Sequence, residues 1–132
     1  MLGKAGQLLS VTPLYAAALA FLFLMLSIRV ILARRFQDVG FGAPAASDLE
    51  RRVRVHANFA EYVPFALLLL ALAELRGAPP GWLHLDGVLL VGGRLAHAIG
   101  VSRARTDEIG RILGMSGTQS AILLAAILNL AV

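Results

Sequence analysis

The chain has no cysteine among its 132 residues. This absence excludes disulfide bonds, thiolate metal sites and a cysteine nucleophile. Any sulfur chemistry at this protein therefore needs a thiol that a ligand supplies. The sequence also lacks two common binding signatures. The glycine pair at 92 and 93 does not extend to GxGxxG, and no spacing of His, Asp and Glu predicts a metal site.

Charged residues are scarce as well, at 15% of the chain, whereas 58% of the residues are hydrophobic. A soluble chain of this size needs more polar surface than that. Residues 5–28 and 112–132 carry no charge, and about 20 apolar residues are enough to cross a bilayer. We therefore expect residues 1–132 to form one all-α integral membrane domain in contact with membrane lipids, a four-helix bundle with helices at about 13–36, 48–76, 82–100 and 107–131.

Helix boundaries follow from local signals. Thr12 followed by Pro13 predicts an N-cap and a first helical position. Gly77, with prolines shortly after it, predicts the end of the second helix. Pro64 lies inside that helix and is expected to kink it. Glycines in the third helix, and Gly110 with Gly114 in the fourth, favour close contact between helices in lipid.

Basic residues gather at two of the three connections. They are Arg29, Arg34, Arg35, Arg51, Arg52 and Arg54 around the first connection, and Arg94, Arg103, Arg105 and Arg111 around the third. The opposite side has Lys4 and Arg76. Because positive charge marks the cytoplasmic side, the first and third connections are expected in the cytoplasm, with both termini on the other side. A net charge of +4 arranged in this way predicts membrane topology, not nucleic-acid binding.

A polar stripe runs along the second helix. Arg51, Arg54, Asn58 and Glu61 follow one another at spacings of three, four and three residues, with Tyr62 at the edge. On the third helix, Arg94, His97 and Val101 share a face. An acidic or basic side chain at the centre of a spanning helix costs about 2.5–3.5 kcal/mol, so such groups face a protein interior or a wet cavity. Since arginine binds carboxylates in a bidentate manner, these stripes predict a ligand with several carboxylates and one amine.

These segments resemble the family of membrane-associated proteins in eicosanoid and glutathione metabolism, the MAPEG family, which includes microsomal glutathione transferases and leukotriene C4 synthase. The family pattern of arginine, asparagine, glutamate and proline matches Arg54, Asn58, Glu61 and Pro64 within ERRVRVHANFAEYVP. The run ARRF at 33–36 is similar to the end of the family's first helix, and GRLAHAIG at 93–100 to its third helix. The resemblance extends from about residue 28 to residue 117.

The resemblance implies a homotrimer that binds glutathione, as cosubstrate, between neighbouring subunits near the cytoplasmic face. It assigns the ligand to Arg54, Asn58, Glu61 and Tyr62, with Arg34, Arg51 and His56 nearby. The polar stripe of the third helix adds Arg94 and His97 as candidate binding residues. It also implies an arginine near the start of the fourth helix that stabilises the thiolate, for which Arg111 is the preferred residue and Arg105 the alternative. Positive charge lowers the thiol pKa, and the thiolate then attacks a lipophilic electrophile.

The chain departs from the family pattern at several positions. His97 and Val101 stand where glutathione-conjugating members have tyrosines, and Glu108 aligns with the catalytic arginine. The function expected is that of a glutathione transferase or peroxidase. The alternatives are a non-catalytic lipid-binding or accessory protein of the same fold and, less favoured, a small multidrug transporter. Glu61 paired with Arg54 or Arg94 is the structural alternative to ligand binding. Alanine- and arginine-rich usage favours a bacterial inner membrane.

Overall fold

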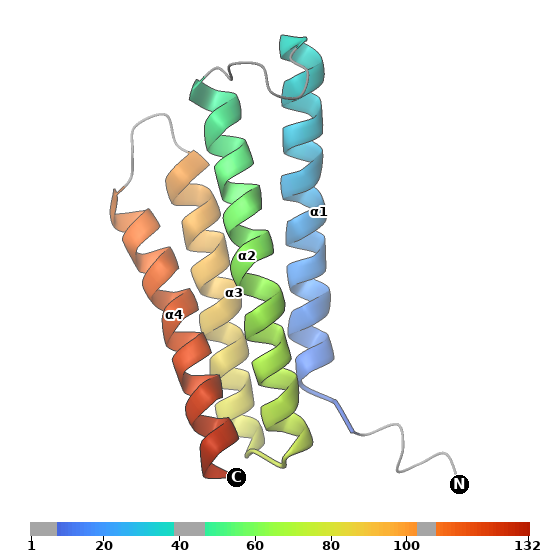
Figure 1. Cartoon of the computed structure of the whole chain (residues 1–132), viewed down its shortest axis with the longest axis vertical. Helices are drawn as coiled ribbons and strands as arrows, with labels where there is room; N and C mark the ends of the chain where they lie inside the picture. The colour runs from blue at the N-terminus through green and yellow to red at the C-terminus, as the bar shows by residue number, and fades with distance from the viewer. Residues whose placement is uncertain (1–7, 39–46, 103–107) are drawn as a thin grey trace, which may run out of the picture.

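The computed structural model describes residues 8–38, 47–102 and 108–132, and these residues form a bundle of helices (Figure 1). The helices are α1 (Thr12–Gln37), α2 (Ser47–Leu75), α3 (Pro80–Ser102) and α4 (Glu108–Ala131). The described residues include no strand. Each helix begins and ends within two residues of the bounds expected from the sequence. The predicted all-α bundle is therefore confirmed.

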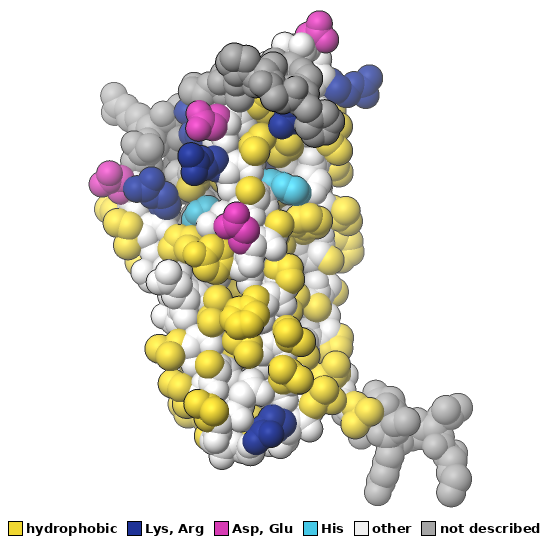
Figure 2. Space-filling model, in the orientation of Figure 1, with side chains coloured by type: hydrophobic (Ala, Val, Ile, Leu, Met, Phe, Trp, Pro, Cys, Tyr) yellow, Lys and Arg dark blue, Asp and Glu magenta, His cyan; other side chains and the backbone are white. Residues whose placement is uncertain are grey.

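Three of the helices found in the described residues, α1, α2 and α4, are long and apolar enough to cross a membrane. Helix α3 is long enough, at 23 residues, but it carries Asp86, Arg94 and His97. All three of these side chains are buried inside the bundle, whereas large apolar side chains such as Phe21 and Ile112 face outward. Polar groups inside and apolar groups outside are the arrangement that lipid requires. Figure 2 shows the outer part of it, hydrophobic side chains spread over the middle of the visible face. The chain is an integral membrane protein.

Helices α2 and α3 occupy the middle of the bundle. Helix α1 packs on α2 and α3, and α4 packs on the same two helices, whereas no packing of α1 on α4 is found in the described residues. Helix α2 runs without a break through Pro64. The end of α1, the start of α2, the end of α3 and the start of α4 lie at one end of the bundle, opposite the end where α1 begins and α4 ends (Figure 1).

The contact between α3 and α4 is made by glycine. A Cβ atom added to Gly93 would lie 2.8 Å from the backbone nitrogen of Thr118, and one added to Gly100 would lie 2.7 Å from that of Arg111. A Cβ at Gly114 would overlap the backbone of His97. Because only glycine lets the two backbones approach this closely, these residues fix the distance between His97 on α3 and Arg111 on α4.

Helix α1 begins differently from the sequence expectation. Val11 occupies the N-cap position without a side-chain cap, and Thr12 is already helical. Thr12 as N-cap was therefore wrong by one residue. The free N–H groups are satisfied from α2, since the carboxylate of Glu74 accepts hydrogen bonds from the backbone nitrogens of Ser10, Val11 and Thr12 at 2.6, 2.7 and 2.7 Å. A distant carboxylate thus replaces the local hydroxyl as the cap.

Candidate functional site

Charged side chains gather at the end of the bundle where α2 begins and α3 ends (Figure 2). There α2, α3 and α4 enclose a polar groove of about 480 Å³. We use this name for the space lined by Val53, Arg54, Ala57, Asn58, Glu61, His97, Val101 and Arg111. Two smaller spaces adjoin it and share Arg111 with it.

Helix α2 supplies one wall of the polar groove. Arg54, Asn58 and Glu61 line it together because their spacing of four and three residues keeps them on one helical face. The Arg54 guanidinium lies 3.9 Å from the carboxylate of Glu50, and both side chains are largely exposed. An ion pair of this length and exposure contributes little free energy, so Arg54 remains available to a ligand.

Helix α3 supplies a buried arginine, Arg94, behind that wall. Arg94 is 1% exposed, and its Nη2 donates a hydrogen bond of 2.7 Å to Oδ1 of Asn58. The guanidinium also lies over the ring of Phe59, 5.9 Å from its centre. The remaining nitrogens, Nε and Nη1, have no hydrogen-bond partner among the described residues. Arg94 is therefore joined to the lining of the groove by its hydrogen bond to Asn58.

His97 follows Arg94 by one turn and lines the polar groove directly. Its side chain is buried, and its Nδ1 has no hydrogen-bond partner within the described parts of the chain. The backbone of Gly114 packs against it. His97 is thus held in a fixed position in the wall of the groove, with its Nδ1 buried.

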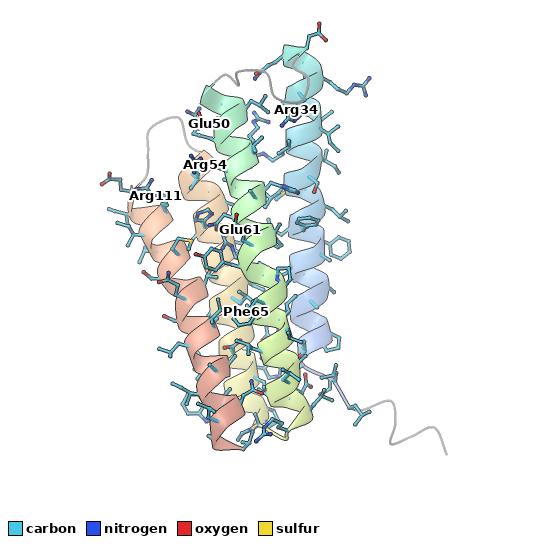
Figure 3. The ribbon with its side chains drawn as sticks, in the orientation of Figure 1. Arg34, Glu50, Arg54, Glu61, Phe65 and Arg111 are labelled. Atoms are coloured by element: carbon cyan, nitrogen blue, oxygen red, sulfur yellow. The ribbon has the colours of Figure 1, made fainter. Side chains whose placement is uncertain are left out.

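Helix α4 supplies Arg111, which closes the groove opposite α2 (Figure 3). Neither Arg111 nor Glu61 makes an ion pair or hydrogen bond to another described residue. The structural alternative, in which Glu61 is locked to Arg54 or Arg94, is therefore not what the described residues adopt. Two opposite charges that face one groove without pairing are placed to bind a ligand that carries both signs.

The space toward the connections is an outer recess of about 200 Å³, lined by Glu50, Arg51, Arg54, Gly100, Val101, Glu108 and Arg111. Arg51 lies there 3.6 Å from Asp48. On the α4 side is an inner recess of about 370 Å³, lined by Asn58, His97, Arg111, Ile112, Met115 and Ser116. Sequence reasoning missed Met115 and Ser116, although their position one turn beyond Arg111 could have indicated them.

Other predicted residues lie elsewhere. His56 turns toward α1, where its Nε2 lies 2.9 Å from Oγ of Ser27 and its ring stacks on Phe23 at 4.9 Å. Arg34 lies on α1, away from Arg111 (Figure 3). Tyr62 is half-buried next to Glu61. Arg105 lies outside the described residues. No group of three His, Asp or Glu side chains suited to a metal ion is found in the described ranges.

The fold and the groove define an integral membrane helical bundle with a polar site at one end. The sequence profile of the MAPEG family matches residues 12–131, and the chain belongs to this family. It is 35% identical over 120 residues to the inner membrane protein YecN of Escherichia coli K12, an alignment that covers 91% of this chain and 90% of the relative. The protein of the same name from Escherichia coli O6:H1 matches equally well.

Proposed function

We propose that this protein binds glutathione in the polar groove and uses it, as a transferase or peroxidase, against lipophilic electrophiles. The observation that carries the proposal is the set of unpaired opposite charges, Glu61 and Arg111, that face one groove beside Arg54 and Asn58. Membership of the MAPEG family supports it, because glutathione metabolism is part of the family's name.

The chemistry of glutathione matches these groups. At neutral pH it carries two carboxylates, one ammonium group and a thiol. Guanidinium groups such as those of Arg54 and Arg111 form paired hydrogen bonds to carboxylates, and the carboxylate of Glu61 complements the ammonium group. Since the chain has no cysteine, glutathione also supplies the sulfur that the protein lacks.

Arg111 is the residue we assign to thiol activation. It lines the polar groove and both recesses, so a thiol placed at their junction lies within its reach. A fixed positive charge there favours the thiolate over the thiol. The thiolate sulfur forms a bond to an electrophilic carbon, and the leaving group departs with its electron pair. Ile112 and Met115 give the inner recess an apolar side on which a lipophilic substrate can lie.

Assembly as a homotrimer explains the residues that lie elsewhere. Arg34 and His56 belong to the α1 side of the bundle, whereas Arg54 and Arg111 open onto the α4 side. A neighbouring copy that places its α1 against the polar groove brings its own Arg34 and His56 to the ligand. The glutathione site is then shared by two subunits, as the family resemblance implies.

The orientation proposed for the chain places the polar groove near the cytoplasmic face. The groove lies near the end of the bundle where α1 ends and α2 begins, and Arg34, Arg54 and Arg111 lie toward that end (Figure 3). Arginine-rich connections stay in the cytoplasm. Cytoplasmic glutathione then has direct access. The relative YecN is named an inner membrane protein, and we assign this chain to a bacterial inner membrane as well.

Conjugation activity tests this function. Detergent-purified protein is incubated with reduced glutathione and an electrophilic aryl halide, and product is followed by absorbance. We expect turnover in the wild type and a loss of about 100-fold in Arg111→Ala, the size reported for removing one group that stabilises a developing charge. Arg52→Ala is the matched control, because Arg52 pairs with Asp48 at 2.9 Å and does not line the groove.

A second candidate is a glutathione-binding protein without turnover. It is favoured by Val101, which lines the groove with an aliphatic side chain where conjugating members of the family have a tyrosine. Binding of glutathione by the wild type, with no product from aryl halides or lipid hydroperoxides, would select this candidate. A transporter is less favoured, because Glu61, the one carboxylate among the described residues that line the polar groove, lies among arginines.

A further inference from the structure

The amide of Asn58 has two different ends, and the structure determines which end meets Arg94. A guanidinium group has hydrogen-bond donors and no acceptor. The contact of 2.7 Å between Nη2 of Arg94 and Asn58 therefore requires the carbonyl oxygen of the amide, whichever way the amide is drawn. The Nδ2 group, with its two donors, must point away from Arg94.

Arg94 cannot turn aside to release that oxygen. It is the largest fully buried side chain among the described residues, at 1% exposure, and the ring of Phe59 lies beneath its guanidinium. Asn58 is half-buried and lines both the polar groove and the inner recess. With Oδ1 held inside the bundle, the part of Asn58 that a ligand meets is the donor end.

We propose that Arg94 is a positioning residue, which holds Asn58 as a hydrogen-bond donor so that this point of the groove favours a charged carboxylate oxygen of the ligand over a neutral carbonyl oxygen. The inference rests on the proposed glutathione site and adds the reason why Asn58 offers the ligand a hydrogen-bond donor. Along α2 the groove then presents donors at Arg54 and Asn58 and an acceptor at Glu61. This order gives a zwitterionic ligand one direction of binding.

The first test is Asn58→Asp. An aspartate accepts the hydrogen bond from Arg94 at least as strongly as asparagine, so a role confined to joining α2 to α3 is preserved. The donor toward the groove is lost. We expect calorimetry to show glutathione binding weakened by about 10- to 100-fold, the range for one lost hydrogen bond to a charged group, with thermal stability unchanged or raised. Binding within about twofold of the wild type overturns the proposal.

The second test separates positioning from contact. In Arg94→Gln the new side chain both donates and accepts, so the amide of Asn58 is free to reverse. The probes are glutathione and two analogues, each with one of its carboxylates converted to a primary amide. For each analogue we take the ratio of its Kd to the Kd of glutathione. In the wild type we expect this ratio to be about 10 for the analogue whose altered carboxylate contacts Asn58. In Arg94→Gln that ratio should fall below about threefold, while the ratio for the other analogue is unchanged.

The outcomes distinguish this inference from the proposed function. Glutathione binding by the wild type with both ratios unchanged in Arg94→Gln overturns the positioning role alone. Absence of glutathione binding by a folded wild-type oligomer overturns the proposed function and this inference with it. Arg94→Lys keeps a donor without an acceptor, and we expect it to restore the wild-type ratio in part. A ratio in Arg94→Lys that equals that of Arg94→Gln also contradicts the proposal.

Discussion

Gly114 on α4 lies directly against the backbone of His97 on α3, with no room for a methyl group between them. The same glycine-lined contact continues at Gly93 and Gly100. Because His97 lines the polar groove and Arg111 stands one turn before Gly114, the packing of α3 on α4 determines the width of the site. A change in this contact should therefore alter ligand binding without removing any group that binds.

We predict that Gly114→Ala destabilises the bundle by about 1–3 kcal/mol, the usual cost of overpacking, and weakens glutathione binding. The added methyl group forces α3 and α4 apart and shifts His97. Thermal unfolding followed by circular dichroism and calorimetric binding measure the two effects. Gly92→Ala is the matched control, because a Cβ at Gly92 meets no atom within 4 Å. Equal behaviour of the two variants would contradict the role of the glycine contact.

We predict that Glu74→Ala destabilises α1 by about 1–3 kcal/mol, because the N–H groups at its beginning lose their acceptor. Glu74→Gln keeps one carbonyl oxygen and should lose less. The midpoint of thermal unfolding in detergent orders the proteins as wild type, Glu74→Gln and Glu74→Ala. Glu50→Ala serves as a comparison, since the Glu50 side chain is 62% exposed. An unchanged midpoint in Glu74→Ala would show that Glu74 does not cap α1.

Substitution of Asp86 is expected to stabilise the protein, in contrast to the substitutions of Gly114 and Glu74. Asp86 is fully buried on α3, and neither carboxylate oxygen has a hydrogen-bond partner among the described residues. Burying such a group without a partner is unfavourable by about 1–3 kcal/mol. Asp86→Ala should therefore raise the midpoint of thermal unfolding, or at least leave it unchanged. A clear decrease would mean that Asp86 has a stabilising partner, such as a neighbouring subunit, in the assembled protein.

A site shared between subunits predicts complementation. Arg34→Ala and Arg54→Ala should each abolish glutathione binding when they form homotrimers. In mixed trimers of the two variants, at least one interface joins an intact Arg34 to an intact Arg54, so binding should return in part. The measurement is calorimetry on trimers purified through two different affinity tags. Mixed trimers that bind no glutathione would contradict a shared site and favour one contained within a single chain.

The sequence predicted the helices well because their signals are local. Long uncharged stretches such as 112–132 specify spanning helices, and the spacing of Arg54, Asn58 and Glu61 specifies one face of α2. Their meeting with His97 and Arg111 in one groove also followed, since all of them lie near the ends that the first and third connections join.

What the sequence could not give depends on contacts between distant residues. Glu74 caps α1 from 62 residues away, so the local rule selected Thr12 instead. Likewise, helical spacing placed Asn58 and Arg94 on polar stripes, but only packing of α2 on α3 shows that the two side chains bond to each other. His56 lies on the same helix as Asn58, but its side chain turns toward Ser27 on α1. Periodicity along α2 alone does not determine this direction.

The most direct test of the account is calorimetric titration of reduced glutathione into the detergent-purified wild type, Arg54→Ala, Glu61→Ala and the control Arg52→Ala. We predict binding in the micromolar to low-millimolar range by the wild type and by Arg52→Ala, and its loss in both Arg54→Ala and Glu61→Ala. A folded wild-type oligomer that binds no glutathione, or binding that survives both substitutions in the polar groove, would contradict it.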